Sequence, residues 1–205
     1  RRFMQNRKPF DLSTFTRCYN IFQIFTCAYF AYKFHVNGVK VIYAWKCMEG
    51  YIPDDSFKDY GWWCLMLRAV EFSETVTFIL RKKHNQISFL HVYHHISTLA
   101  MVWLFHRMGA SRMDLYVFAI NCYIHVIMYT YYLMSSFPQL RKVTNFVKPF
   151  ITLSQIMQFV TMLSNFYITY TTSCHISILF YLQVLNVATL LVLFSKFYLK
   201  SLSKE

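Results

Sequence analysis

Six stretches of about 20 mostly apolar residues follow one another along this chain. An α-helix needs about 20 such residues to cross the roughly 30 Å hydrocarbon layer of a bilayer. Turn-forming or charged residues separate the stretches, including Asn37-Gly38, Arg81-Lys82-Lys83, Pro138 and Pro149. The sequence therefore predicts an all-α, polytopic membrane helix bundle, with spans at approximately 14–34, 60–80, 87–106, 113–134, 150–170 and 175–199.

The composition supports lipid as the solvent of these helices. Of the 205 residues, 56% are hydrophobic, 20% are aromatic and only 15% are charged, whereas about 25% are charged in soluble domains. The net charge of +12 would by itself suit nucleic acid. The basic residues, however, gather at the ends of apolar stretches and mostly on one side of the map. This bias argues against a nucleic-acid partner and leaves a soluble all-α protein as a minor alternative. It predicts that both ends of this sequence face the cytosol.

The second span carries an ionic face. Arg68, Glu71 and Thr75 follow one another at about one helical turn, with Glu74 beside them. Charged groups inside a span cost free energy unless they pair or face a protein interior. A packing ion pair and a catalytic role for Arg68 and Glu71 both remain open.

The third span contains three histidines within five residues, and the fourth adds another. His91, His94 and His95 lie on one side of a helix, and Asn121 and His125 share a face in the next span. Because burying several imidazoles in lipid is costly, the cluster indicates a reactive or metal site rather than simple packing.

Basic residues border the histidine span on the side predicted to be cytosolic. Arg81, Lys82 and Lys83 precede it, and Lys148 stands at the start of the fifth span. Positive-inside anchoring explains these residues, and so does a multiply phosphorylated ligand at the mouth of a cavity.

The histidine pattern separates several chemistries. A zinc-protease helix would read H-E-x-x-H, but Val92 follows His91, so the sequence predicts no zinc hydrolase. Membrane di-iron desaturases and hydroxylases also use H-x-x-H-H boxes, but those enzymes share a pattern of three histidine boxes. The remaining histidines here are dispersed near the ends of spans, so we expect no metal. A di-iron oxygenase and a non-enzymatic membrane transporter stay as alternatives.

An ordered set of motifs resembles a known family. The matching segments are Asn-Arg-Lys-Pro-Phe at 6–10, Leu-Arg-Lys-Lys at 80–83, Gln86, Phe-Leu-His-Val-Tyr-His-His at 89–95, and the runs 125–132 and 152–159. Together they resemble the family that elongates very-long-chain fatty acids, the condensing enzymes of microsomal elongation. Where that family usually has Lys-x-x-Glu-x-x-Asp-Thr, this chain has Arg68 and Glu74 in the Lys and Asp places. The change in reach leaves substrate preference and turnover open.

The resemblance implies a fold and a reaction. The family has seven helices around a closed substrate tunnel, so residues 1–205 are expected to form a single transmembrane domain without the first family helix and the C-terminal tail. The implied reaction is decarboxylative condensation of a long-chain acyl-CoA with malonyl-CoA to 3-oxoacyl-CoA, with no cofactor. The implied location is the endoplasmic reticulum membrane. Enzymes of the later elongation steps are candidate partners, and the sequence is compatible with a homo-oligomer.

The resemblance also assigns roles to residues. His94 is expected to be a nucleophile that forms an acyl-imidazole, with His125 near the thioester and enolate, and His91 and His95 orienting groups or exchanging protons. The competing role for His94 is a general base in direct transfer. The residues expected to bind the CoA phosphates and pantetheine are Arg68, Arg81, Lys83, Gln86 and Lys148, and Asn121 is expected to orient the thioester end.

Two cysteines lie in loops that this map places in the lumen. These are Cys47 and Cys174. Because the lumen is oxidising, the sequence predicts a disulfide between them, with two free thiols as the alternative.

Overall fold

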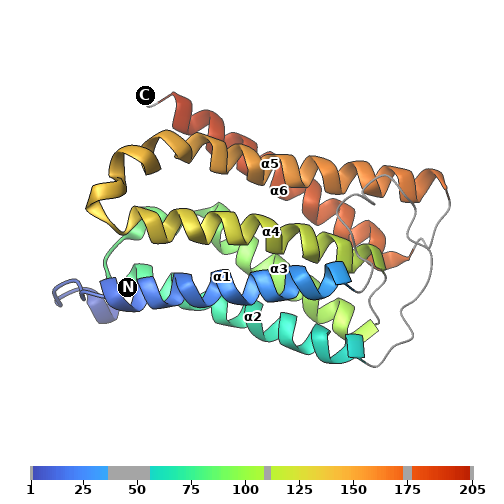
Figure 1. Ribbon diagram of the computed structural model, residues 1–205, viewed down its shortest axis with the longest axis horizontal. Helices are drawn as coiled ribbons and strands as arrows, with labels where there is room; N and C mark the ends of the chain where they lie inside the picture. Colours follow the sequence, from blue (N-terminus) through green and yellow to red (C-terminus); the bar gives the residue numbers. More distant parts are fainter. Residues whose placement is uncertain (1, 37–55, 109–111, 173–176, 204–205) are drawn as a thin grey trace. The chain divides into compact units, whose positions relative to one another are not determined.

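The computed structural model describes residues 2–36, 56–108, 112–172 and 177–203. Within these ranges the chain forms helices and no strand, which confirms the predicted all-α class. The long helices, drawn in Figure 1, are α1 (Ser13–Val36), α2 (Ser56–Leu80), α3 (Phe89–Met108), α4 (Arg112–Ser135), α5 (Arg141–Thr171) and α6 (Ile178–Leu202). The same described ranges hold three short 3-10 helices: η1 (Arg2–Met4) before α1, η3 (His84–Gln86) between α2 and α3, and η4 (Pro138–Leu140) between α4 and α5.

Three segments among the described residues are long and apolar enough to cross a membrane. They are Met113–Ser135, Pro138–Thr171 and Ile178–Leu202. The fold is therefore that of a membrane helix bundle. The membrane spans predicted for α1, α2 and α3 stay predictions, as does the orientation of the chain. Helices α2 and α3 carry the charged residues and the histidines of the candidate site.

The helices form two compact units, and each is described by itself. Unit 1 comprises the described residues of Arg1–Thr16 and Pro53–Gly109, and α2 packs against α3 within it. Unit 2 comprises those of Arg17–Ile52 and Ala110–Glu205, and α5 packs there against both α4 and α6.

A tight turn ends α2 in unit 1. The N–H of Lys82 donates to the carbonyl of Ile79 (3.1 Å), and the N–H of Lys83 donates to the carbonyl of Phe78 (2.8 Å). These two bonds are the pattern of a Schellman motif. Lys82 has a φ of 54°, the left-handed region in which glycine is the usual residue. The turn and η3 lead the chain into α3, which packs along α2.

The N-terminal segment is bonded to this same turn. The backbone N–H of Phe10 donates to the carbonyl of Leu80 (3.0 Å). Nη1 of Arg81 donates to Oγ1 of Thr16 (3.4 Å), and Nζ of Lys82 donates to the carbonyl of Gln5 (3.4 Å). The basic connection between α2 and α3 is thus held by residues from the start of the chain.

Helix α5 corrects one predicted boundary. The sequence predicts a break at Pro149 and a span from about residue 150, whereas α5 begins at Arg141 and runs through Pro149 to Thr171. Proline lacks the N–H that would bond to the carbonyl four residues earlier, and its ring crowds that carbonyl, which kinks a helix. In Figure 1, α5 bends within its first third, so the proline bends the helix here without ending it.

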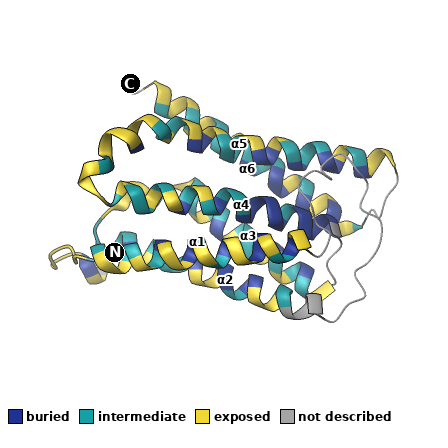
Figure 2. Ribbon diagram, viewed as in Figure 1, coloured by how far each residue is buried: buried dark blue, intermediate teal, exposed yellow. Residues whose placement is uncertain are grey.

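The core of unit 2 follows the first half of α4. From Met113 to Cys122 every residue except Val117 is buried, and Figure 2 shows this part as an almost continuous dark segment. Phe118 meets the rings of Phe30 and Phe34 edge-on, with centroids 6.2 and 5.6 Å apart. Such edge-on pairs stabilise a core beyond the area that they bury. This packing against α1 anchors the helix that carries Asn121 and His125.

Candidate active site

A buried ion pair lies on α2. Nη1 of Arg68 donates to both carboxylate oxygens of Glu71, at 2.7 and 2.8 Å. The two side chains are 3% and 1% exposed. Charges this deeply buried are tolerated only when they are paired. The structure therefore forms the ion pair that the spacing suggested, and a contact of Arg68 with CoA stays a prediction.

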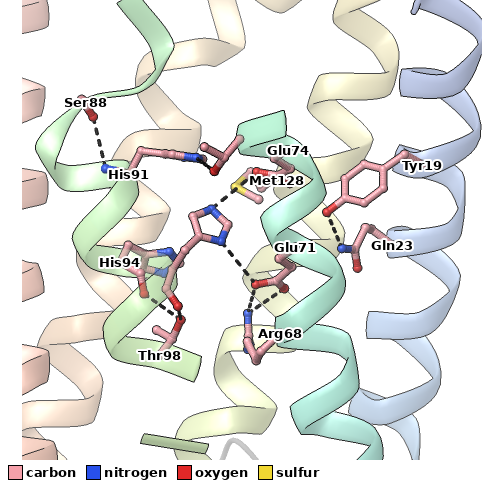
Figure 3. A network of polar contacts seen from close by, with 12 residues as sticks. Tyr19, Gln23, Arg68, Glu71, Glu74, Ser88, His91, His94, Thr98 and Met128 are labelled. Atoms are coloured by element: carbon pink, nitrogen blue, oxygen red, sulfur yellow. Dashed lines mark hydrogen bonds and ion pairs between the residues drawn. The ribbon is translucent and has the colours of Figure 1, made fainter. Parts of the chain in front are cut away.

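The imidazole of His95 is flanked by two carboxylates. Its Nε2 lies 3.6 Å from Oε2 of Glu74, and its Nδ1 lies 4.0 Å from Oε2 of Glu71. The residue is 7% exposed. Figure 3 shows that both glutamates point from α2 toward α3. A carboxylate near each ring nitrogen orients the imidazole and can accept a proton from it.

His91 and His94 complete a continuous histidine cluster. Nε2 of His91 lies 2.8 Å from Oγ1 of Thr75 on α2. The ring centroids of His91 and His95 are 4.4 Å apart, and those of His94 and His95 are 5.4 Å apart with the rings nearly perpendicular. The structure thus brings together the three histidines that the sequence places on one side of this helix.

Hydroxyl groups fix the backbone that carries the cluster. Oγ of Ser88 accepts from the backbone N–H of His91 (3.2 Å), the N-capping arrangement at the start of α3. Oγ1 of Thr98 donates to the carbonyl of His94 (2.7 Å). Both contacts are visible in Figure 3. The first turns of α3 are therefore held at both ends of the histidine run.

The cluster includes the donor set of a metal ion. Glu74, His91 and His95 each offer one ligand atom, and these atoms lie within 4.8 Å of one another. Two imidazoles and one carboxylate bind catalytic zinc and non-haem iron. The sequence-based expectation of no metal considered only the number and spacing of histidines, and it did not consider Glu74 as a ligand. Among the described residues this is the only such group, whereas a di-iron oxygenase needs ligands for two ions.

The fourth-span residues lie in unit 2 and face its interior. Nδ2 of Asn121 donates to Oε1 of Gln158 on α5 (3.5 Å), and the two residues are 9% and 5% exposed. His125 is also buried, and its ring meets that of Tyr129 edge-on at 5.6 Å. Asn121 therefore links α4 to α5, and its assignment to the thioester end of the substrate stays a prediction.

The basic residues expected to bind CoA belong to both units. Arg81, Lys83 and Gln86 lie in the connection between α2 and α3 in unit 1, and Lys148 is exposed on α5 in unit 2. Partial burial, and next the charge of Arg81, lower the pKa of Lys83 below its ordinary value. A contact of these residues with CoA stays a prediction.

Unit 2 contains other buried polar residues that the sequence analysis did not identify as candidates. Asn20 and Gln23 on α1, and Gln183 and Asn186 on α6, are all less than 10% exposed. Nε2 of Gln23 donates to the hydroxyl of Tyr19 (2.6 Å; Figure 3). Each pair is spaced by three residues within an apolar helix. Because polar groups are costly to bury in a membrane, this spacing of polar residues in an apolar stretch is the sequence signal that identifies them.

A cavity of about 740 Å³ lies between α4 and α5. Its volume is within the 300–1,000 Å³ typical of ligand pockets. Its lining is mostly aromatic and aliphatic, with polar groups from Ser154, Gln158 and Thr161. Several lining side chains, including Phe150 and Met157, are exposed, so it is an open groove rather than an enclosed pocket. The closed tunnel expected from the resemblance stays a prediction. The expected Cys47–Cys174 disulfide lies outside the described residues.

Comparison with known proteins gives a match over the whole chain. Residues 1–205 match the family described as ELO: GNS1/SUR4 family. The chain is 37% identical to very long chain fatty acid elongase F of Drosophila simulans over 166 residues, 77% of this chain and 63% of that protein. It is 30% identical to elongase 5 of Xenopus laevis over 208 residues, 100% of this chain and 70% of that protein. It is 31% identical to elongase 1 of Homo sapiens over 211 residues, 99% of this chain and 75% of that protein.

Proposed function

The chain belongs to the ELO: GNS1/SUR4 family, and on this premise we propose that it is the condensing enzyme of a fatty-acid elongation cycle. It joins a long-chain acyl-CoA to malonyl-CoA and releases 3-oxoacyl-CoA, carbon dioxide and free CoA. One observation carries the proposal: the cluster in which the buried His95 lies between Glu71 and Glu74 and contacts the half-buried His91 and His94. The names of the relatives as very long chain fatty acid elongases support it.

The first half-reaction transfers the acyl group to the protein. A ring nitrogen of His94 attacks the carbonyl carbon of the thioester and the C–S bond breaks. CoA leaves as a thiolate, which takes up the N–H proton that the acylated imidazole ring gives up. The product is an acyl-imidazole. Neutral imidazole is nucleophilic near physiological pH because its ordinary pKa is about 6.5.

The second half-reaction forms the new carbon–carbon bond. Malonyl-CoA loses carbon dioxide, and the electron pair of the broken bond becomes the enolate of acetyl-CoA. The enolate attacks the acyl carbonyl, the C–N bond to His94 breaks, the departing ring nitrogen takes up a proton from the solvent, and 3-oxoacyl-CoA is released. His125 is proposed to stabilise the thioester and enolate oxygens.

The contacts of the other histidines suit supporting roles. His91 lies at hydrogen-bond distance from Thr75, and His95 lies between two carboxylates at 3.6 and 4.0 Å. Imidazoles fixed in this way can orient the neighbouring His94 ring and exchange protons with it. The choice of His94 as the nucleophile follows the family pattern, and these contacts support it.

The proposal also covers the residues that bind CoA, the cofactor requirement and the location of the protein. Lys83 and Lys148, with Arg81, Gln86 and Arg68, bind the CoA portions of both substrates, and Asn121 orients the thioester. The reaction uses no cofactor. The protein works in the endoplasmic reticulum membrane, with both ends of this sequence on the cytosolic side.

Incorporation of labelled malonyl-CoA tests the proposal. Purified protein in lipid nanodiscs receives acyl-CoA and malonyl-CoA labelled on the retained carbons, and we expect label in 3-oxoacyl-CoA. The His94→Ala variant should lose this product. His84→Asn, which alters an exposed histidine outside the cluster, should keep it. Oxygen-dependent oxidation of the acyl chain without incorporation would instead identify an oxygenase.

A further inference from the structure

The histidine cluster contains a set of potential metal ligands, although the proposed condensation uses no metal ion. We propose that Glu74, His91 and His95 bind a zinc ion that inhibits the enzyme. Glu74 comes from α2, the two histidines come from α3, and all three belong to unit 1. One ligand atom from each lies within 4.8 Å of the other two.

The distances are close to those of a loaded site. Neighbouring ligand atoms in a tetrahedral zinc site are about 3.4 Å apart, given bonds of about 2.0–2.1 Å to nitrogen and oxygen. Nε2 of His95 and Oε2 of Glu74 are already 3.6 Å apart. The third ligand atom, on the half-buried His91, lies within 4.8 Å of the other two. A metal bond through Nε2 of His91 would replace the contact of that atom with Thr75. A water molecule completes the fourth position, as in other sites with three protein ligands.

A second carboxylate stands where it would support the metal. Within the described part of the chain, Nδ1 of His95 has no hydrogen-bond partner, although the residue is 7% exposed. When Nε2 binds a metal, Nδ1 carries the proton and needs an acceptor. Oε2 of Glu71 lies 4.0 Å from this atom, and Arg68 holds that carboxylate in place. A small approach of the two side chains gives the carboxylate–histidine–metal arrangement that raises metal affinity.

The donor types select the class of ion. Magnesium and calcium prefer sites made of oxygen ligands, so two imidazoles disfavour both. Zinc accepts nitrogen and oxygen donors in a tetrahedral site without geometric strain. Access is also available, since the side chain of Glu74 is 14% exposed.

Zinc at this position would oppose the reaction. Coordination occupies the nitrogen lone pairs of His91 and His95, the two histidines proposed to orient and exchange protons beside His94. This inhibitory effect rests on the proposed condensing function, whereas binding of the ion does not.

Metal binding is measured directly on the full chain in nanodiscs. After removal of metal, zinc is titrated against a chromophoric chelator, and the zinc-loaded protein is examined by X-ray absorption. We expect one tight zinc ion per chain, a coordination shell of nitrogen and oxygen with two imidazoles and no sulfur, and no competition from excess magnesium. Glu74→Gln should weaken zinc binding about 100-fold, while His84→Asn leaves it unchanged. His91→Gln provides a second loss-of-ligand variant, and both loss variants are checked by thermal unfolding.

The outcomes separate the two proposals. Equal zinc affinity in folded Glu74→Gln and wild type, or sulfur in the shell, overturns the site. Tight binding to the expected ligands with unchanged condensation overturns the inhibitory role. Tight binding in a protein that forms no 3-oxoacyl-CoA even after metal removal supports the site and overturns the proposed function instead.

Discussion

Nε2 of His91 lies 2.8 Å from Oγ1 of Thr75, a contact that joins α3 to α2 beside the two glutamates. Thr75→Val removes the oxygen and keeps the shape of the side chain, so the His91 ring loses its partner. We expect kcat to fall about tenfold, which is about 1.4 kcal/mol of barrier, with KM for acyl-CoA within about twofold of wild type. Thr75→Ser should recover kcat. Steady-state condensation assays measure both constants, and a wild-type kcat in Thr75→Val would show that this contact only aids packing.

The buried pair of Arg68 and Glu71 predicts an asymmetric response to mutation. Arg68→Met leaves a carboxylate buried without its cation, which should cost about 3–5 kcal/mol of stability. The double variant Arg68→Met with Glu71→Leu removes both charges and should recover most of that loss. Thermal unfolding of the protein in detergent gives the comparison. Equal stability of the single and double variants would mean that water already reaches this carboxylate.

Lys83 predicts a pH dependence of substrate binding. Its pKa is lowered by partial burial and by Arg81, so the free protein loses this charge at a lower pH than an ordinary lysine does. CoA phosphates favour the charged form. The affinity for acyl-CoA should therefore fall as pH rises through the lowered pKa. Lys83→Arg should remove that fall, because arginine stays charged. Measurement of KM from neutral pH to about pH 10 checks this, and identical profiles for the two proteins would contradict it.

Neutralising both proposed phosphate ligands tests their role in affinity. Lys83→Gln with Lys148→Gln removes two charge-assisted contacts, so we expect KM for acyl-CoA to rise at least about tenfold. The exposed Lys142, also on α5, provides a matched control as Lys142→Gln. A normal KM in the double variant would return these lysines to the role of topology anchors.

The acyl-imidazole predicts a burst of CoA before malonyl-CoA is added. Incubation with acyl-CoA alone should release about one CoA per active site and add one acyl mass to the peptide that contains His94. Rapid-quench mass spectrometry detects both. Persistence of the adduct in His94→Ala, or normal turnover without any adduct, would favour direct transfer with His94 as a general base.

Glycine at position 82 is expected to make the protein more stable than alanine at that position. The φ of 54° at Lys82 places a side-chain-bearing residue in the left-handed region. A Cβ costs about 1 kcal/mol there. Lys82→Gly should therefore be more stable than Lys82→Ala by about that amount, since both lose the same charge. Thermal unfolding of the two variants checks this, and equal melting temperatures would show that the turn is relaxed.

Apolar stretches were sufficient to predict the helices, because a span of about 20 residues leaves few alternatives in lipid. Pro149 was misjudged for a physical reason. A proline lowers the stability of a helix at one point, but the packing of α5 against α4 and α6 outweighs that cost, and sequence does not show such packing.

The site was predictable where it depends on spacing within one helix. His91, His94 and His95 share a side of α3 by periodicity alone, and Arg68 reaches Glu71 in the same way. The approach of Glu74 and Glu71 to His95 depends on how α2 is rotated against α3, which periodicity does not determine. For the same reason Glu74 was recognised as part of a polar face but not as a potential ligand.

The backbone bond from Phe10 to Leu80 has a consequence for biogenesis. Unit 1 is assembled from two separate stretches of the chain, and the described residues between them, 17–36, belong to unit 2. Phe10 leaves the ribosome long before Leu80, so the early segment waits without its partner until α2 has been made. Closing so long a loop costs entropy, which favours formation of this bond after α2 and α3 have paired locally. The basic turn that Phe10 and Thr16 secure therefore reaches its final form only once the α2–α3 hairpin is complete, after about half of the 205 residues have been made.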